Sequence, residues 1–376
     1  MDRTQFSLED VLEMIPNGLF QNRLFAICGL AFMTDSLGVN LLSFLTTCAA
    51  AEWKLSNAGQ AALTSIVFVG IIAGSIFWGR FADDHGRKKT LLYSCLMVTV
   101  GGFASALAPS YEFLVISRGI AGFGIGGASI PFDLLAELLP VATRSKYLVY
   151  MGVFWTLGSM LVSGMAWAVL PTLGWRFLSF ITTVPVFATT FIAYIYLPES
   201  PRWLLEVDRE PDAIKIIRDA ALVNNVELPE FTLTLMNSVE VHGSYKELVD
   251  TPEARRITLP LWLIWAAVGF SYYGTILFVS RVYSNQDNIS QDSTPQCEFN
   301  YAAIFYNASA EIVSVFISAL LIEPLGRIKS QSVFYLIGGV SVFCMGVTSN
   351  PGAVLFFALL ARMGINSGLV SICWCC

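Results

Sequence analysis

Charged residues are scarce in this chain of 376 residues, and histidine is almost absent. Asp, Glu, Lys and Arg together make up 13% of the sequence, about half the share found in soluble domains. Only two histidines occur, neither grouped with cysteines, so no metal site is expected. The net charge is −6 and the 22 Lys and Arg residues are dispersed. This distribution excludes a basic surface for nucleic acid.

Motifs of several enzyme classes are also missing. The chain has no Walker loop and no HExxH helix, and its glycine-rich stretch 122–127 lies within an apolar run. We therefore expect no enzyme activity, no catalytic residues and no cofactor. We expect no cleavable signal either, because the first apolar stretch starts only at residue 24.

Hydrophobic residues, in contrast, make up 55% of the chain, and the mean hydropathy is +0.63. Ten apolar runs are long enough for a membrane helix, which needs about 20 residues. They cover 23–47, 59–80, 90–109, 112–135, 147–170, 176–197, 258–281, 301–323, 331–349 and 352–373. The sequence therefore predicts an all-α integral membrane protein. Four cysteines in apolar surroundings are expected to be free buried thiols: Cys28, Cys48, Cys95 and Cys344.

Lys and Arg indicate the orientation, since cytoplasmic loops retain them. With the N-terminus inside, 17 of the 22 lie in cytoplasmic segments, three in outer loops and two within spans. We therefore predict four regions along the chain. They are a cytoplasmic N-terminus (1–22), a six-helix half (23–197), a cytoplasmic linker (198–257) and an incomplete four-helix half (258–376).

Two short helices are predicted outside the spans. Ser7 to Asp10 resembles a helix start, and Val11, Leu12 and Ile15 form one apolar face, which predicts a short helix lying on the membrane. Residues 212–223 read as a helix within the linker. For the linker, a strap that closes a gate and a solvated connector are both open interpretations.

The two halves share a charged motif. Asp83 precedes Gly86-Arg87 as Glu323 precedes Gly326-Arg327, and Arg118-Gly119 is echoed by Arg362-Met363-Gly364. Parallel repeats mark transporters whose two halves move about a central site. We predict a cytoplasmic gate, with a positive-inside anchor as the alternative. The gate residues are Gly79, Asp83, Gly86, Arg87, Lys88, Glu137, Arg144, Glu323, Gly326 and Arg327.

These motifs carry a family resemblance over about residues 7–370. The 79–89 loop, and Arg118 with the glycines that follow it, resemble signatures of the major facilitator superfamily. Segments 137–144 and 198–202 resemble its sugar-porter and organic-ion branch. Segments 63–70, 122–127, 153–155, 173–176 and 270–274 are similar to the synaptic vesicle protein two-related transporters. The resemblance implies the major facilitator fold.

The chain departs from this family pattern at two places. Family members have twelve spans, whereas only ten are found here, so we expect either a truncated sequence or a non-transporting form. The family tends to carry an acid at the position of Gly38, three residues after Asp35. Asp133 is a speculative replacement for that missing acid.

Charged residues inside spans are costly unless they are paired, protonated or turned to the bundle interior. Asp35 and Glu311 are predicted to bind a cation or a proton; hydrogen bonding between helices is the alternative. Arg118 resembles an arginine whose counterparts influence coupled proton movement, although it could also extend to the outer interface. Three aromatic residues, with Phe270 nearby, suit a ring or cation in a central cavity, with packing as the alternative: Trp155, Tyr272 and Tyr273.

Together these features predict a secondary active transporter of a small organic ion, working by alternating access and coupled to protons. A non-transporting receptor or scaffold and a sugar facilitator are the alternatives. The expected partners are a small-molecule substrate, protons and the lipid bilayer, with the protein acting as a monomer. Asn288 begins an acceptor sequon in an outer loop, so we expect glycosylation there if the cell is eukaryotic. The resemblance implies a vesicle membrane, and the residues fit the plasma membrane equally well.

Overall fold

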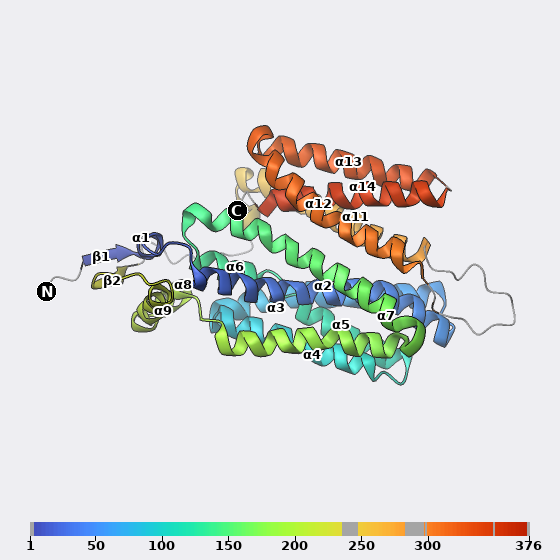
Figure 1. Cartoon of the computed structure of the whole chain (residues 1–376), viewed down its shortest axis with the longest axis horizontal. Coiled ribbons are helices and arrows are strands. Elements are labelled where there is room, and N and C mark those ends of the chain that lie inside the picture. The colour runs from blue at the N-terminus through green and yellow to red at the C-terminus, as the bar shows by residue number, and fades with distance from the viewer. Residues whose placement is uncertain (1–3, 235–246, 283–296, 298, 349, 374–376) are drawn as a thin grey trace.

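The computed structural model describes residues 4–234, 247–282, 297, 299–348 and 350–373. Two groups of long helices run side by side (Figure 1). The first group comprises α2 (Leu19–Trp53), α3 (Asn57–His85), α4 (Arg87–Ala106), α5 (Tyr111–Ile125), α6 (Ile130–Leu138) and α7 (Val141–Tyr196). The second comprises α11 (Pro252–Val282), α12 (Tyr301–Leu325), α13 (Arg327–Val347) and α14 (Pro351–Cys373).

In the described part of the chain, eight helices are long and apolar enough to cross a membrane. One of them, α7, has 56 residues and breaks at Gly174, whose φ is 75°. A straight helix of that length would be about 84 Å long, far more than the roughly 30 Å of a bilayer core. The chain reverses at the break (Figure 1), so α7 supplies two of the predicted spans. Helix α14 contributes a shorter apolar stretch, Gly352–Gly368.

Glycines allow the helices of the first group to pack closely. A Cβ on Gly74 would lie 2.1 Å from the Phe123 carbonyl oxygen, and one on Gly122 would lie 2.3 Å from that of Val67. Backbone therefore touches backbone between α3 and α5, as small residues permit in membrane helices. Between the groups, α7 packs on α12 and α14, and α2 packs on α11.

A small layer of short elements covers one end of the first group (Figure 1). We call this end of the molecule the α9 end. It contains α1 (Leu8–Glu13), α8 (Pro201–Glu206), α9 (Glu210–Val223) and a parallel pair of strands, β1 (Thr4–Ser7) and β2 (Phe231–Thr234). The short helix α10 (Glu247–Asp250) precedes α11. The predicted linker helix is confirmed as α9. The strand pair was not predicted.

The start of α1 is confirmed, but its predicted position on the membrane is wrong. Ser7 and Asp10 form a reciprocal capping box. Val11 and Ile15 have no exposed surface and Leu12 is buried, because the apolar face packs into a core cluster with residues of α6, α8 and α9. The face that predicted membrane contact is therefore used for packing within the protein.

Candidate functional site

A buried ion pair joins two helices of the second group. Glu311 on α12 is fully buried and Arg362 on α14 is 4% exposed. The Arg362 Nε donates to Glu311 Oε1 over 2.7 Å, and its Nη1 donates to Asn307 Oδ1 over 3.0 Å. Asn307 and Glu311 are four residues apart on α12, so they present neighbouring side chains to the same arginine.

Hydrogen bonds extend this pair to the first group of helices. The Tyr272 hydroxyl on α11 donates to Glu311 Oε1, and the Trp155 Nε1 on α7 donates to the Tyr272 hydroxyl oxygen. We call these five residues the buried network: Trp155, Tyr272, Asn307, Glu311 and Arg362. The network links the two groups through polar side chains where α7 meets α11, α12 and α14.

Three polar atoms of the buried network have no hydrogen-bond partner within the described residues. They are Glu311 Oε2, Asn307 Nδ2 and Arg362 Nη2. A buried donor or acceptor without a partner costs about 1–3 kcal/mol. One acceptor and two donors are therefore available here for water or for a polar ligand.

Asp35 lies in the middle of α2 and is 6% exposed. Its carboxylate forms no hydrogen bond or ion pair with any residue that the structure describes. The Asp35 carboxylate also interacts electrostatically with the Tyr273 phenol. Phe32, one turn away on α2, contacts the Trp155 ring at 5.1 Å between centroids. Asp35 is thus an unpaired buried carboxylate near aromatic side chains that border the buried network.

Arg118 on α5 is 1% exposed, which excludes extension to the membrane surface. Its Nη2 donates to the Gly38 carbonyl oxygen over 2.8 Å, and its Nε has no partner among the described residues. The arginine therefore binds the backbone of α2 at Gly38, and it forms no ion pair with Asp35.

A cluster of charges occupies the α9 end where α3 meets α4. Gly86 has a φ of 96°, which favours glycine and makes a tight junction between the helices. The Arg87 guanidinium lies 3.2 Å from Asp83 and 3.4 Å from Glu137. Glu199 Oε1 accepts the Lys88 backbone N–H over 2.9 Å. We call these residues, with Gly86, the charge cluster.

The remaining predicted gate residues are placed as follows. The Arg144 Nη2 donates to the Leu139 carbonyl oxygen over 3.3 Å. A Cβ on Gly79 would have no neighbour within 4 Å. Gly326, between α12 and α13, has a φ of 78° and so repeats the junction at Gly86. The Glu323 and Arg327 side chains, like Asn288, lie outside the described residues.

Two predicted site residues are located elsewhere. Asp133 is exposed and interacts electrostatically with Arg87, Glu137 and Asp83, so it belongs with the charge cluster and does not substitute for an acid near Arg118. Phe270 is 83% exposed and points away from any core, as expected of a side chain in contact with lipid.

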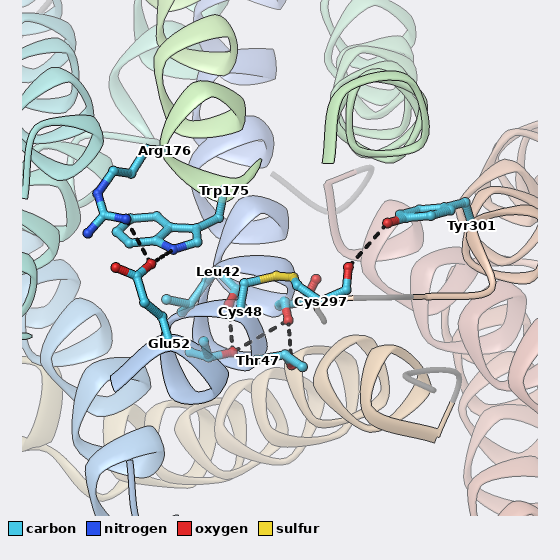
Figure 2. The surroundings of a disulfide bond; sticks show 10 residues. Leu42, Thr47, Cys48, Glu52, Trp175, Arg176, Cys297 and Tyr301 are labelled. Carbon is cyan, nitrogen blue, oxygen red and sulfur yellow. Dashed lines mark hydrogen bonds and ion pairs between the residues drawn. A yellow bond between two sulfur atoms is a disulfide. The ribbon is translucent and has the colours of Figure 1, made fainter. Parts of the chain in front are cut away.

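A disulfide joins the two groups at the end opposite α9, which we call the disulfide end. Figure 2 shows Cys48 of α2 bonded to Cys297, whose Cα lies 5.0 Å away, just before α12. The prediction that Cys48 is a free thiol is therefore wrong. Nearby, Glu52 accepts hydrogen bonds from Trp175 Nε1 and Arg176 Nη1, both over 2.7 Å.

Sequence reasoning did not assign Arg362 and Asn307 to the site. Arg362 was recognised only as a repeat of Arg118, and Asn307 lies in a glycosylation pattern within a span. The signal that could have found them is spacing. Asn307 and Glu311 are one helical turn apart, and a buried carboxylate requires a basic partner within the bundle.

The helix arrangement is that of the major facilitator fold. The xylose transporter XylE from E. coli, in a partially occluded inward-open conformation, superimposes with a TM-score of 0.72. Its sequence is 18% identical, and the match covers 95% of this chain and 84% of that one.

Sequence comparison identifies the family. The pattern of the sugar (and other) transporter family matches residues 22–376. The synaptic vesicle 2-related protein of Bos taurus is 32% identical over 96% of this chain and 68% of its own length. Organic cation/carnitine transporter 7 of Arabidopsis thaliana is 28% identical over 88% and 73%. The chain belongs to the sugar (and other) transporter family.

Proposed function

We propose that this protein is a secondary active transporter of a small organic ion that works by alternating access and is coupled to protons. The buried network is the observation that supports this proposal most strongly. Its hydrogen bond from Trp155 to Tyr272 crosses between the two helix groups. Relative motion of the groups must break this bond, so the state of Glu311 and Arg362 is coupled to that motion.

The charge of the substrate is inferred from Asp35. A buried carboxylate without a partner is expensive within a membrane, and a bound cation or proton relieves that cost. Aromatic rings beside a carboxylate favour organic cations, through the negative face of the ring. The name of the Arabidopsis relative, organic cation/carnitine transporter, agrees with an organic ion as substrate.

Proton coupling is assigned to Glu311. Protonation of its carboxylate would remove the charge that holds Arg362, and Arg362 would then be free to bind an anionic group or to move with α14. Deprotonation would restore the ion pair. The protonation state of Glu311 can thus control whether Arg362 is held or released.

The charge cluster is proposed to be a gate. We place the α9 end in the cytoplasm, because the loops there hold most of the Lys and Arg residues. The ion pairs of Arg87 with Asp83 and Glu137 connect α4 to α3 and α6. The hydrogen bond from the Lys88 backbone N–H to Glu199 connects α4 to the segment after α7. These bonds stabilise one arrangement of the helix ends and must rearrange when the cytoplasmic side opens.

A sugar facilitator is the second candidate, favoured by the family description and by the likeness to a xylose transporter. Asp35 weighs against it, because a neutral sugar needs no unpaired carboxylate. Uptake measurements separate the two candidates.

The test is uptake into proteoliposomes under an imposed pH gradient, with panels of organic cations, organic anions and hexoses. We expect gradient-driven accumulation of an organic ion, lost in Asp35→Asn and Glu311→Gln. Glu112→Gln, which changes an exposed carboxylate at the start of α5, is the matched control. Hexose equilibration that ignores the gradient would instead establish a facilitator. Absence of flux for every panel would favour a receptor or scaffold.

A further inference from the structure

A cavity of about 810 Å³ with a mixed polar and apolar lining lies at the α9 end, beside the charge cluster. Its walls come from the starts of α2 and α4, the end of α7, and helices α8 and α9. Cavities that bind small ligands have volumes of roughly 300–1,000 Å³. This space is therefore large enough for a polar headgroup, and it is separate from the buried network.

Positive charge dominates the lining of this cavity. Five cations and three carboxylates line it, and two of the carboxylates are already engaged. Asp212 pairs with Arg209 over 2.6 Å, and Glu199 accepts the Lys88 N–H. The side chains of the other four cations form no ion pair or hydrogen bond with the residues that the structure describes: Arg23, Lys88, Lys89 and Lys215. Arg23 lies 5.9 Å from the centroid of the Phe20 ring, and Lys88 interacts electrostatically with Glu199. Unpartnered cations in a concave site favour an anionic ligand.

The cavity opens at the level of the membrane interface. Tyr194 and Tyr196, in the last turn of α7, line it and are 66% and 54% exposed. Tyrosines at the ends of membrane helices lie among the lipid headgroups. An anion that reaches this cavity therefore can arrive as part of a phospholipid, with its acyl chains remaining in the bilayer beside α7.

We propose that this cavity binds a phosphate-bearing anion, supplied by the headgroup of an acidic phospholipid. Lys89 extends from α4 and Lys215 from α9, so a bound phosphate contacts both helices and holds α9 against the start of α4. The cytoplasmic leaflet, on which we place the α9 end, is the leaflet rich in anionic lipids. The bound lipid would thus stabilise the helix ends that carry the charge cluster.

The experiment measures binding of phosphatidylinositol 4-phosphate to the full chain in phosphatidylcholine nanodiscs, by native mass spectrometry. We expect retention of the phosphorylated lipid over phosphatidylcholine, weakening as salt is raised. Lys89→Gln and Lys215→Gln should each weaken binding about fivefold, the contribution of one interfacial cation. Arg218→Gln is the matched control, because Arg218 is exposed on α9 and does not line the cavity.

Soluble inositol 1,4-bisphosphate distinguishes the two sources of phosphate. Weaker binding of this soluble ligand than of the lipid supports the proposal, and equal binding overturns the lipid assignment. Equal loss in Arg218→Gln and Lys215→Gln would also overturn it, because general surface charge would then explain the binding. Thermal unfolding in pure phosphatidylcholine shows that each variant is folded, and none of these measurements depends on transport.

Discussion

The two halves of the molecule differ in the partners of their buried arginines. Arg118 and Arg362 occupy repeated positions, and both are buried. Arg362 has an acid partner, Glu311, on the neighbouring helix. Arg118 has only the Gly38 carbonyl oxygen, although Asp35 lies three residues before Gly38 on the same helix.

This difference distinguishes a neutralised pair in the second half from an unpaired carboxylate in the first. In the second half the carboxylate and guanidinium neutralise each other, and the energetic cost of burial is offset by the pair. In the first half the Asp35 carboxylate forms no ion pair with the described residues, which is the basis for proposing that it binds a ligand or a proton. The two halves share the backbone geometry of the junction, as the positive φ values of Gly86 and Gly326 show, while the partners of their buried arginines differ.

The largest expected effect is on the free energy of unfolding, and we expect a loss in the second half and none in the first. Glu311→Ala leaves Arg362 buried without an acid and should lower the free energy of unfolding by about 3–5 kcal/mol. Asp35→Asn removes an unpaired carboxylate and should not lower it. The measurement is unfolding in mixed micelles, followed by tryptophan fluorescence. Combining Glu311→Ala with Arg362→Met should recover much of the loss, and equal losses in both halves would contradict the comparison.

The disulfide that joins the two groups gives the next largest effect. Loss of the Cys48–Cys297 bond, which links residues 249 apart in sequence, should lower the free energy of unfolding by about 2–4 kcal/mol. Cys48→Ala is compared with Cys28→Ala, which changes a buried free thiol. Reductant should destabilise the unaltered protein and Cys28→Ala but leave Cys48→Ala unaffected. A Cys48→Ala protein that still responds to reductant would contradict this bond.

Features that depend on local sequence could be predicted, and features that join distant segments could not. Apolar runs predicted the spans, and the Ser7–Asp10 capping pattern predicted the start of α1. Strands β1 and β2 have four residues each and pair across more than 220 residues, so neither carries a signal of its own. Cys48 lies in an apolar run that hides its partner in a polar loop.

The candidate site shows the same limit. Burial cost identified Asp35, Glu311 and Arg118 as residues that need explanation, because hydropathy alone places them inside spans. Their partners depend on which helix faces point together. Nothing in the local sequence indicates that Arg118 contacts Gly38 while Arg362 contacts Glu311.

Placing an acid next to Arg118 tests whether this arginine can form an ion pair as Arg362 does. Gly38→Asp places a carboxylate beside Arg118, and the new Cβ meets only the flexible end of Ile125, at 2.8 Å. This variant should be more stable than Gly38→Asn by about 1.5 kcal/mol, the contribution of a hydrogen bond to a charged group. Both are measured by unfolding in mixed micelles. Equal stability would mean that Arg118 cannot exchange the carbonyl for a carboxylate.

The helix junctions give the smallest expected difference. Gly86→Ala and Gly326→Ala both place a Cβ at a positive φ with an extended ψ, which costs roughly 1–3 kcal/mol in either half. At Gly86 the Cβ would also lie 2.4 Å from Glu199 Oε2, whereas at Gly326 it would meet nothing within 4 Å. Because Glu199 must then move from the Lys88 N–H, Gly86→Ala should be less stable by a further ~1 kcal/mol, about one hydrogen bond. Adding Glu199→Ala to Gly86→Ala removes that contact, so any extra cost that persists must arise from the backbone of the junction itself.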